Sequence, residues 1–193
     1  LIESRMGIQG FTEALVASSP AEGLVSVEVP ATESALSISD VFGILGSKGE
    51  LVISLNEDGS EPFIPKNAQG DELTWNECIV RADAIYDSST SSYGIYVEFD
   101  DFGLEALKEG TSAITSSTPI YFILDGETIS NPNVSSQITS NYSQITGLST
   151  PVAAQTMAIQ FMSGSYPLDV VNTTWERSLA TTRQICFFLF MQL

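Results

Sequence analysis

The stretch YFILDGETISNPNV, from Tyr121 to Val134, decides how this chain folds. It begins with an apolar run that is typical of a buried strand, and Asp125-Gly126 follows directly. Glycine accepts a positive φ and an aspartate side chain bonds to turn backbone, so Asp125 and Gly126 predict a tight hairpin turn. Pro132 has no backbone N–H and therefore predicts that the segment after the turn lies at a sheet edge or a bulge.

The segments around this hairpin predict a repeated pattern of strands and helices. CIVRADAIYD (78–87) and YGIYVEFDD (93–101) are strand-like and are separated by SSTSS. A helix follows, with Asp100 or Asp101 placed to cap it, and a second helix begins at Pro151 behind Ser149 or Thr150. The order strand-strand-helix-strand-strand-helix predicts an α+β, ferredoxin-like sandwich with the helices on one face of an antiparallel sheet.

The two ends of the chain have the same mixed character and are expected to form a second ferredoxin-like sandwich. Residues 1–30 predict a helix, a turn and a strand that ends at Pro30, and residues 31–49 predict a helix that ends at Gly46. ELVISL (50–55) predicts a strand, and YPLDVV (166–171) is a candidate final strand. The run ICFFLFM near the C-terminus has three interpretations: a strand, the beginning of a membrane helix, or an artefact. It is far shorter than the ~20 residues that span a bilayer.

Composition excludes several classes of protein. The 193 residues are 43% hydrophobic, which argues against disorder. The 24 acidic and 7 basic residues give a formal charge of -17, and no basic stripe is visible, so nucleic-acid binding is not expected. There is no histidine, which removes the Ser-His-Asp triad and the usual zinc ligands. Cys78 and Cys186 form no CxxC motif, and we expect two unpaired thiols, with a long-range disulfide as the alternative.

Carboxylates are the candidates for chemistry. An extracytoplasmic hydrolase or metal-binding module would need Glu98, Asp100, Asp125 and Glu127 to converge in one pocket. Helix capping and turn formation explain the two aspartates without catalysis or a metal. We therefore expect no catalytic residue, no metal site and no cofactor, and we do not expect an enzyme.

Binding of an extended polypeptide has better support. An edge strand around Pro132 would accept another strand by addition, and exposed tyrosines would contact an unfolded chain. For tyrosines, half-buried packing on a sheet is the simpler alternative. The candidate polypeptide-binding residues are Tyr96, Ile129, Pro132, Val134 and Tyr142.

The segment LDGETISNPNVSSQITSNYSQITG (124–147), the helix after it and GSYP (164–167) resemble the hallmark stretch of the SecD protein-export family. The matching residues are Leu124, Asp125, Gly126, Ile129, Ser130, Pro132, Ile138, Thr139, Gln144, Ile145, Thr146, Gly147, Ala154, Ala158, Gly164 and Pro167. Further matches upstream are Ile2, Arg5, Gly10, Glu13, Val27, Pro30, Phe99, Gly103 and Thr111. The resemblance covers roughly residues 1–171.

The chain departs from the family pattern at three places. SNYS replaces the usual double glycine before QITG, and Tyr166 replaces the leucine of the G-x-L-P exit. Beyond Val171 the match is poor, where the family leads into its second membrane helix.

The resemblance implies the first large extracytoplasmic domain of a SecD-like membrane protein. It implies a base of residues 1–56 and 166–193, an inserted head of residues 57–165, and a hinge at Gly59, Gly164 and Pro167. It also implies transient binding of unfolded preprotein during export driven by the proton motive force. The implied partners are a SecF-like subunit and the Sec channel, reached through membrane helices outside this chain. An adhesion or assembly module is the remaining alternative.

Overall fold

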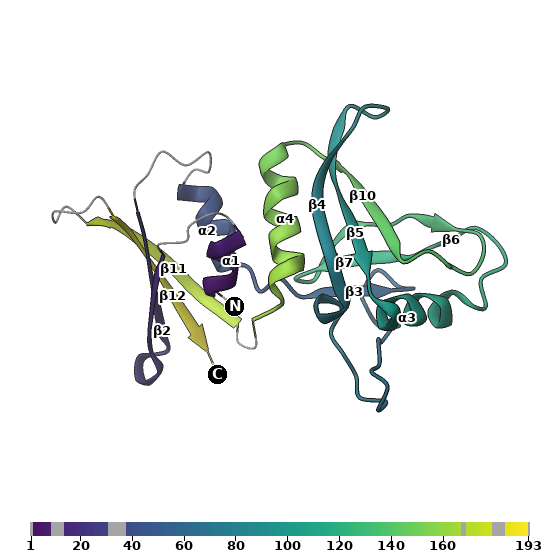
Figure 1. Ribbon diagram of the computed structural model, residues 1–193, viewed down its shortest axis with the longest axis horizontal. Coiled ribbons are helices and arrows are strands. Elements are labelled where there is room, and N and C mark those ends of the chain that lie inside the picture. Colours follow the sequence, from purple (N-terminus) through teal and green to yellow (C-terminus); the bar gives the residue numbers. More distant parts are fainter. Residues whose placement is uncertain (1, 9–13, 31–37, 167–168, 179–183, 193) are drawn as a thin grey trace. The chain divides into compact units, whose positions relative to one another are not determined.

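A computed structural model gives the fold and describes residues 2–8, 14–30, 38–166, 169–178 and 184–192 (Figure 1). Within these residues the chain is α+β with small antiparallel sheets, which confirms the predicted class. The chain divides into two compact units. The first unit comprises Leu1–Lys48 and Tyr166–Leu193, and the second unit comprises Gly49–Ser165.

The described residues of the first unit form a four-stranded antiparallel sheet with strand order β1-β2-β12-β11, accompanied by two α-helices. Its elements are α1 (Ile2–Ile8), β1 (Leu15–Ser19), the 3-10 helix η1 (Pro20–Glu22), β2 (Leu24–Pro30), α2 (Ile38–Gly46), β11 (Asp169–Ser178) and β12 (Gln184–Gln192). In β2 the buried Val27 and Val29 alternate with partly exposed residues, which is the pattern of a strand with one covered face.

The apolar run near the C-terminus belongs to β12. This strand pairs antiparallel with β2, from Gln184 opposite Pro30 to Phe190 opposite Leu24. Of the three interpretations of the run, the strand is therefore the one that the structure has. Strand β1 was not predicted, because its LVASS sequence is short and has no clean alternation.

Arg5 of α1 is the largest fully buried side chain among the described residues. Its Nη1 donates to the carbonyls of Ile44 (2.8 Å) and Ser47 (2.5 Å), and its Nη2 donates to the carbonyl of Lys48 (2.8 Å). Its guanidinium carbon lies 3.9 Å from the centroid of the buried Tyr166 ring. The last carbonyls of a helix have no partner within the helix, so Arg5 satisfies and neutralises the C-terminal end of α2.

The second unit contains three small antiparallel sheets, with strand orders β10-β5-β4, β3-β7-β8 and β6-β9. Its strands are β3 (Leu51–Ser54), β4 (Ile79–Asp87), β5 (Ser92–Phe99), β6 (Thr118–Pro119), β7 (Tyr121–Leu124), β8 (Glu127–Ser130), β9 (Asn133–Val134) and β10 (Tyr142–Leu148). Its helices are the 3-10 helix η2 (Trp75–Cys78), α3 (Asp101–Thr111) and α4 (Pro151–Ser163). Pro132, which has no N–H, lies between β8 and β9, where the chain passes from one sheet to another.

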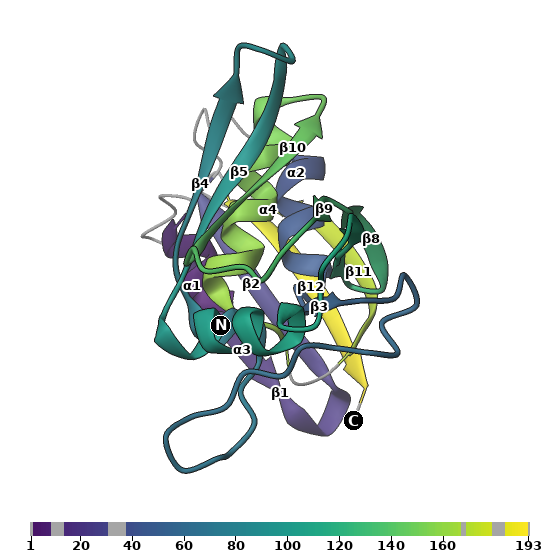
Figure 2. The ribbon, with the colours of Figure 1, turned by 90° about the vertical axis from the view of Figure 1, so that its right-hand side faces the viewer.

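Helix α4 packs along one face of the β10-β5-β4 sheet, as Figures 1 and 2 show. In β5 the residues Ile95, Val97 and Phe99 are buried, whereas Tyr96 and Glu98 between them are partly exposed. The buried set joins a core cluster that also includes residues of β3, α3, β7 and α4. The opposite face of this sheet therefore carries the polar and aromatic side chains.

The first boundary between the units differs from the predicted one. We expected the first segment of the base to end at residue 56, but the structure ends it at Lys48. The reason is that β3 pairs with β7, from Leu51 opposite Leu124 to Ser54 opposite Tyr121, and so belongs to the second unit. The strand was predictable from its sequence, but its pairing partner was not.

The opening stretch forms the hairpin of β7 and β8. Asp125 and Gly126 both have positive φ, 51° and 83°, as a two-residue type I′ turn requires. The Asp125 carboxylate accepts a hydrogen bond from the Glu50 N–H at 2.8 Å, and the Asp125 N–H donates to the Glu50 carbonyl at 3.0 Å. Asp125 thus fixes the turn and also joins it to the chain that enters β3.

Local capping determines where the two α-helices of the second unit begin. The Asp100 carboxylate accepts from the Gly103 N–H at 2.8 Å and caps α3. The Thr150 hydroxyl accepts from the Ala153 N–H at 3.1 Å and caps α4, with Pro151 as its first residue. Among the described residues, no helix is both long and apolar enough to cross a membrane.

Candidate functional site

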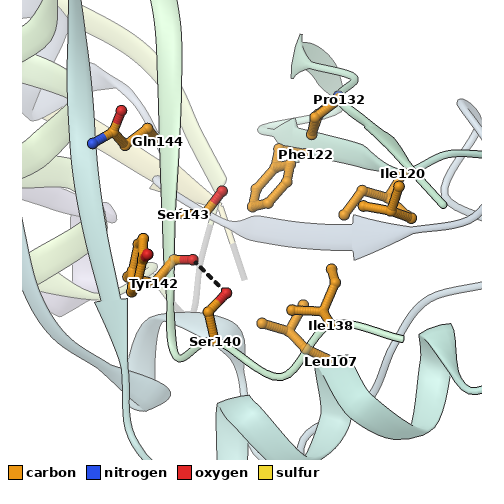
Figure 3. Close-up of a pocket in the computed structure, with 10 residues that line it drawn as sticks. Leu107, Ile120, Phe122, Pro132, Ile138, Ser140, Tyr142, Ser143 and Gln144 are labelled. Carbon is orange, nitrogen blue, oxygen red and sulfur yellow. Dashed lines mark hydrogen bonds between the residues drawn. The ribbon is translucent and has the colours of Figure 1, made fainter. Parts of the chain in front are cut away.

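The second unit has a cavity of about 350 Å³ along the edge of strand β10 (Figure 3). Its apolar lining consists of Leu107, Ile120, Phe122, Pro132, Val134 and Ile138. Its polar lining consists of Ser140, Tyr142, Ser143 and Gln144. We call this cavity the β10 groove.

The floor of the β10 groove is part of the hydrophobic core. Leu107, Ile120 and Phe122 are each 2% exposed, whereas Tyr142 at the rim is 51% exposed. A groove with a buried apolar floor suits side chains that enter from solvent. The Tyr142 ring lies on the far side of β10 from this floor (Figure 3).

Two connections hold the walls of the groove. The Ile120 N–H donates to the Pro132 carbonyl at 3.0 Å, next to the pairing of β6 with β9. The Thr111 hydroxyl of α3 accepts from the Ile138 N–H at 2.9 Å and donates to the Leu107 carbonyl at 2.6 Å. These bonds fasten the irregular segment between β9 and β10 to α3, so the groove is largely preformed.

Strand β10 has one edge available for pairing. It pairs antiparallel with β5, from Tyr142 opposite Glu98 to Leu148 opposite Tyr93, and no strand among the described residues pairs with its other side. Gly94 makes close pairing possible, because a Cβ at this position would lie 2.3 Å from the Ile145 carbonyl oxygen. An unpaired edge beside an apolar groove can add an extended chain through backbone hydrogen bonds.

The beginning of β10 is fixed by Asn141. Its carbonyl accepts from the Phe99 N–H at 2.7 Å, and its Nδ2 donates to a Glu98 carboxylate oxygen and to the Phe99 carbonyl, both at 3.3 Å. Next to it, Tyr142 stacks on Tyr96, with ring centroids 5.8 Å apart and an angle of 22° between the rings. These contacts position the aromatic rim.

The candidate polypeptide-binding residues occupy different places. Pro132, Val134 and Tyr142 line the groove, and Tyr96 stacks on Tyr142. Ile129 lies in β8, packs against the core cluster and is not part of the lining.

None of the three floor residues was among the candidate binding residues. Leu107, Ile120 and Phe122 look like ordinary core residues in the sequence, so no local signal distinguishes them. Ile138 does carry a signal, because it is the single apolar side chain in SSQITSN (135–141).

The residues expected at a hinge are also dispersed. Gly59 has φ of 74° and lies inside the second unit, where its position faces Ile123 and Val52. Gly164 has φ of 80° directly after α4, while Pro167 lies outside the described residues. Gly147, a residue of the QITG match, has φ of 97° at a break in the β10–β5 register.

The carboxylates of the hydrolase hypothesis do not form one site. Asp100 caps α3, Asp125 holds the β7–β8 turn, Glu98 accepts from Asn141, and Glu127 is exposed on β8. Within the part of the chain that the structure describes, no group of three acidic, cysteine or histidine residues could hold a metal. Each aspartate has a structural role that accounts for it.

Cys78 is a free, buried thiol next to the α3 cap. Burial, and then the charge and hydrogen bond of Asp100, raise the pKa of the Cys78 thiol to about 12. The thiol is therefore protonated at physiological pH and behaves as a small core residue. The side chain of Cys186 lies outside the described residues.

Comparison with known proteins places this geometry in a family. Residues 52–168 match the family described as SecDF, P1 head subdomain. The chain is 25% identical over 222 residues to the protein translocase subunit SecD of Petrotoga mobilis, covering 94% of this chain and 46% of the relative. The chain thus spans about half the length of this curated relative.

Two solved structures share the fold. One is SecDF in its super-membrane-facing form, with a TM-score of 0.64 and 19% identity over 86% of this chain and 25% of that chain. The other is described as SecDF, a membrane component that enhances protein export, with a TM-score of 0.64 and 18% identity. It covers 92% of this chain and 90% of that chain.

Proposed function

Because the chain belongs to the SecDF P1 head subdomain family, we propose that it acts in protein export and transiently binds unfolded preprotein. The observation that carries this proposal is the β10 groove. Its floor is apolar, the stacked pair Tyr96 and Tyr142 lies next to it on the outer face of the sheet, and it lies beside a strand edge that is open among the described residues. An unfolded chain offers apolar side chains and unpaired backbone groups together, and this site can accept both.

The rest of the proposal concerns how the two units and the partners outside this chain act in export. The first unit is the base, continuous with membrane helices, and the second unit is the head, on the extracytoplasmic face. Gly164 and Pro167 lie where the chain returns from the second unit to the first, which suits a hinge. A SecF-like subunit and the Sec channel are the partners, and the proton motive force drives export.

The proposed role is non-enzymatic and needs no cofactor. This proposal rests on two observations. Asp100 caps α3 and Asp125 holds the β7–β8 turn, and no carboxylate is among the residues that line the groove. The groove is built for contact rather than for bond cleavage.

The test is binding of a fluorescein-labelled, unstructured peptide of twelve residues with alternating apolar positions, followed by anisotropy. The variant Ile138→Ser with Tyr142→Ala removes one wall and the rim of the groove. We expect binding to weaken about tenfold, since both side chains contact the occupant directly.

The matched control is Val80→Ser, which removes an apolar side chain that is 58% exposed on β4, outside the groove lining. It is expected to change affinity less than about twofold. A second probe, N-methylated on alternate backbone amides, cannot complete a strand ladder and is expected to bind weakly. Equal loss of binding in the groove variant and the control, or no binding of any peptide, contradicts the proposal.

A further inference from the structure

The outer face of the β10-β5-β4 sheet carries an aromatic pair next to a carboxylate. Strand alternation places Tyr96, Glu98 and Tyr142 on this face, opposite the buried Ile95 and Val97. Tyr142 lies directly across from Glu98 in the strand register, and its ring stacks on Tyr96. Tyr142 also lines the β10 groove, so this group continues the groove onto the sheet face.

We infer that Tyr96, Tyr142 and Glu98 form a subsite for a lysine or arginine side chain of the polypeptide that occupies the groove. The inference rests on the proposed function and specifies the polypeptide that is bound, here called the client. It is an apolar segment flanked by a basic residue. The face of a tyrosine ring attracts a cation, and a neighbouring carboxylate adds charge attraction. Tyr142 is 51% exposed, so a side chain arriving from solvent can reach its ring.

The Glu98 carboxylate is positioned by a hydrogen bond and is available to a cation. Glu98 accepts from the Asn141 amide at 3.3 Å, and this neutral donor leaves its negative charge in place. Among the described residues, no lysine or arginine forms an ion pair with Glu98. Arg81 lies across from Glu98 in the register, but its guanidinium is paired with Asp83 on its own strand.

The charge of the second unit favours the same client. Residues 49–165 contain 16 acidic and 3 basic side chains, Lys66, Arg81 and Lys108, which gives a formal charge of −13. Lys108 and Arg81 are in ion pairs with Glu105 and Asp83. A basic polypeptide is therefore attracted at long range and an acidic one is repelled.

The experiment compares two fluorescein-labelled peptides of twelve residues with the same apolar centre. One has an arginine on each side of the centre and the other has citrulline, which keeps the shape and removes the charge. Anisotropy with the 193-residue chain is expected to show tighter binding of the arginine peptide, by about fivefold or more at low salt. The preference is expected to shrink as salt rises, because exposed charges are screened.

Three variants locate the preference. Glu98→Gln keeps the hydrogen-bond acceptor for Asn141, and Tyr142→Leu keeps a large apolar side chain but removes the aromatic ring. Each is expected to reduce the arginine preference by about two- to fivefold. The control Glu57→Gln removes one exposed negative charge from a turn outside the groove and is expected to leave the preference unchanged.

The outcomes separate the subsite from the proposed function. If both peptides bind equally and Glu98→Gln has no effect, the groove binds polypeptide but the cationic subsite is wrong. If Glu57→Gln lowers the preference as much as Glu98→Gln does, the preference arises from the overall negative charge of the unit and not from a local subsite. The inference is then overturned. If neither peptide binds, the proposed function itself fails.

Discussion

The buried side chain of Arg5 connects α1 to the C-terminal end of α2 in the first unit. Its guanidinium donates to three backbone carbonyls around the end of α2 and packs on the Tyr166 ring. Burial raises the pKa of the Tyr166 phenol, and the nearby Arg5 charge lowers it in part. An arginine has the planar fork that this arrangement needs, and a lysine has a single point of charge.

We predict that Arg5→Met destabilises the first unit by about 3 kcal/mol or more, because it leaves buried carbonyls without donors. Arg5→Lys is expected to cost roughly half as much, since it keeps the charge and loses the fork. Urea unfolding measures the free energy, and hydrogen exchange of peptides from β2 and α2 locates the loss.

The control for this prediction is Glu3→Ala, which changes an exposed side chain of the same helix. It is expected to change stability by less than about 0.5 kcal/mol. Unchanged exchange in α2 of Arg5→Met would show that the carbonyls find other donors.

The ionisation of the Cys78 thiol makes the free energy of unfolding depend on pH in the alkaline range. Its pKa is raised from the ordinary value of 9.0 to about 12, so the folded state holds the proton more tightly than the unfolded state does. This contribution to stability is complete below pH 9 and is lost progressively as the pH rises from 9 toward 12.

We therefore predict that Cys186→Ser, which leaves Cys78 as the one thiol, loses unfolding free energy above pH 9 faster than the double variant with Cys78→Ala. Urea unfolding at pH 7 to 10.5 measures the two slopes. Parallel slopes would mean that the Cys78 thiol ionises equally easily in both states.

At the scale of elements, glycines in two helices have opposite surroundings. A Cβ at Gly43 in α2 meets nothing within 4 Å. A Cβ at Gly110 in α3 would lie 2.3 Å from the ring of Phe63, which is 6% exposed and belongs to the core cluster. Helix propensity favours alanine at both positions, but packing opposes it at the second.

We predict that Gly43→Ala stabilises the chain by about 0.5–1 kcal/mol and that Gly110→Ala destabilises it by about 1–3 kcal/mol. For a chain of this length, 1 kcal/mol shifts Tm by roughly 2–4 °C. Thermal unfolding followed by circular dichroism measures the signs, and the same sign for both would contradict the packing argument.

At the scale of the whole molecule, the second unit has its own core, and its first and last segments are hydrogen-bonded to each other. The core cluster lies between Leu51 and Phe161. The buried Asn76 accepts from the Leu51 N–H at 3.2 Å and donates to the carbonyls of Gly49 at 3.0 Å and Phe161 at 3.3 Å. One side chain thus holds the entry and the exit of the unit together, as an inserted domain needs.

We predict that a fragment of Gly49–Ser165 folds cooperatively by itself and binds the arginine peptide with an affinity within about threefold of that of the full chain. Its amide exchange is expected to match that of the same residues in the full chain. A fragment that lacks a cooperative transition would show that the first unit is required for its fold.

The sequence by itself determined the local features of this protein. Residues 93–101 predict a strand and Asp125-Gly126 predicts the turn. The sequence offers Asp100 or Asp101 and Ser149 or Thr150 as caps, and the structure uses Asp100 and Thr150. These features depend on neighbours a few residues apart, and backbone sterics and local hydrogen bonds are readable at that distance. The resemblance to the SecD family is likewise a property of residue order.

Only the tertiary structure decided which distant segments meet. It pairs β3 with β7, which moved the boundary from residue 56 to Lys48, and it buries Arg5 under Tyr166. It also brings Leu107, Phe122 and Ile138 to the open edge of β10. The physical reason is that burial of apolar surface has no direction along the chain, so partners are chosen by packing of the whole unit and not by local pattern.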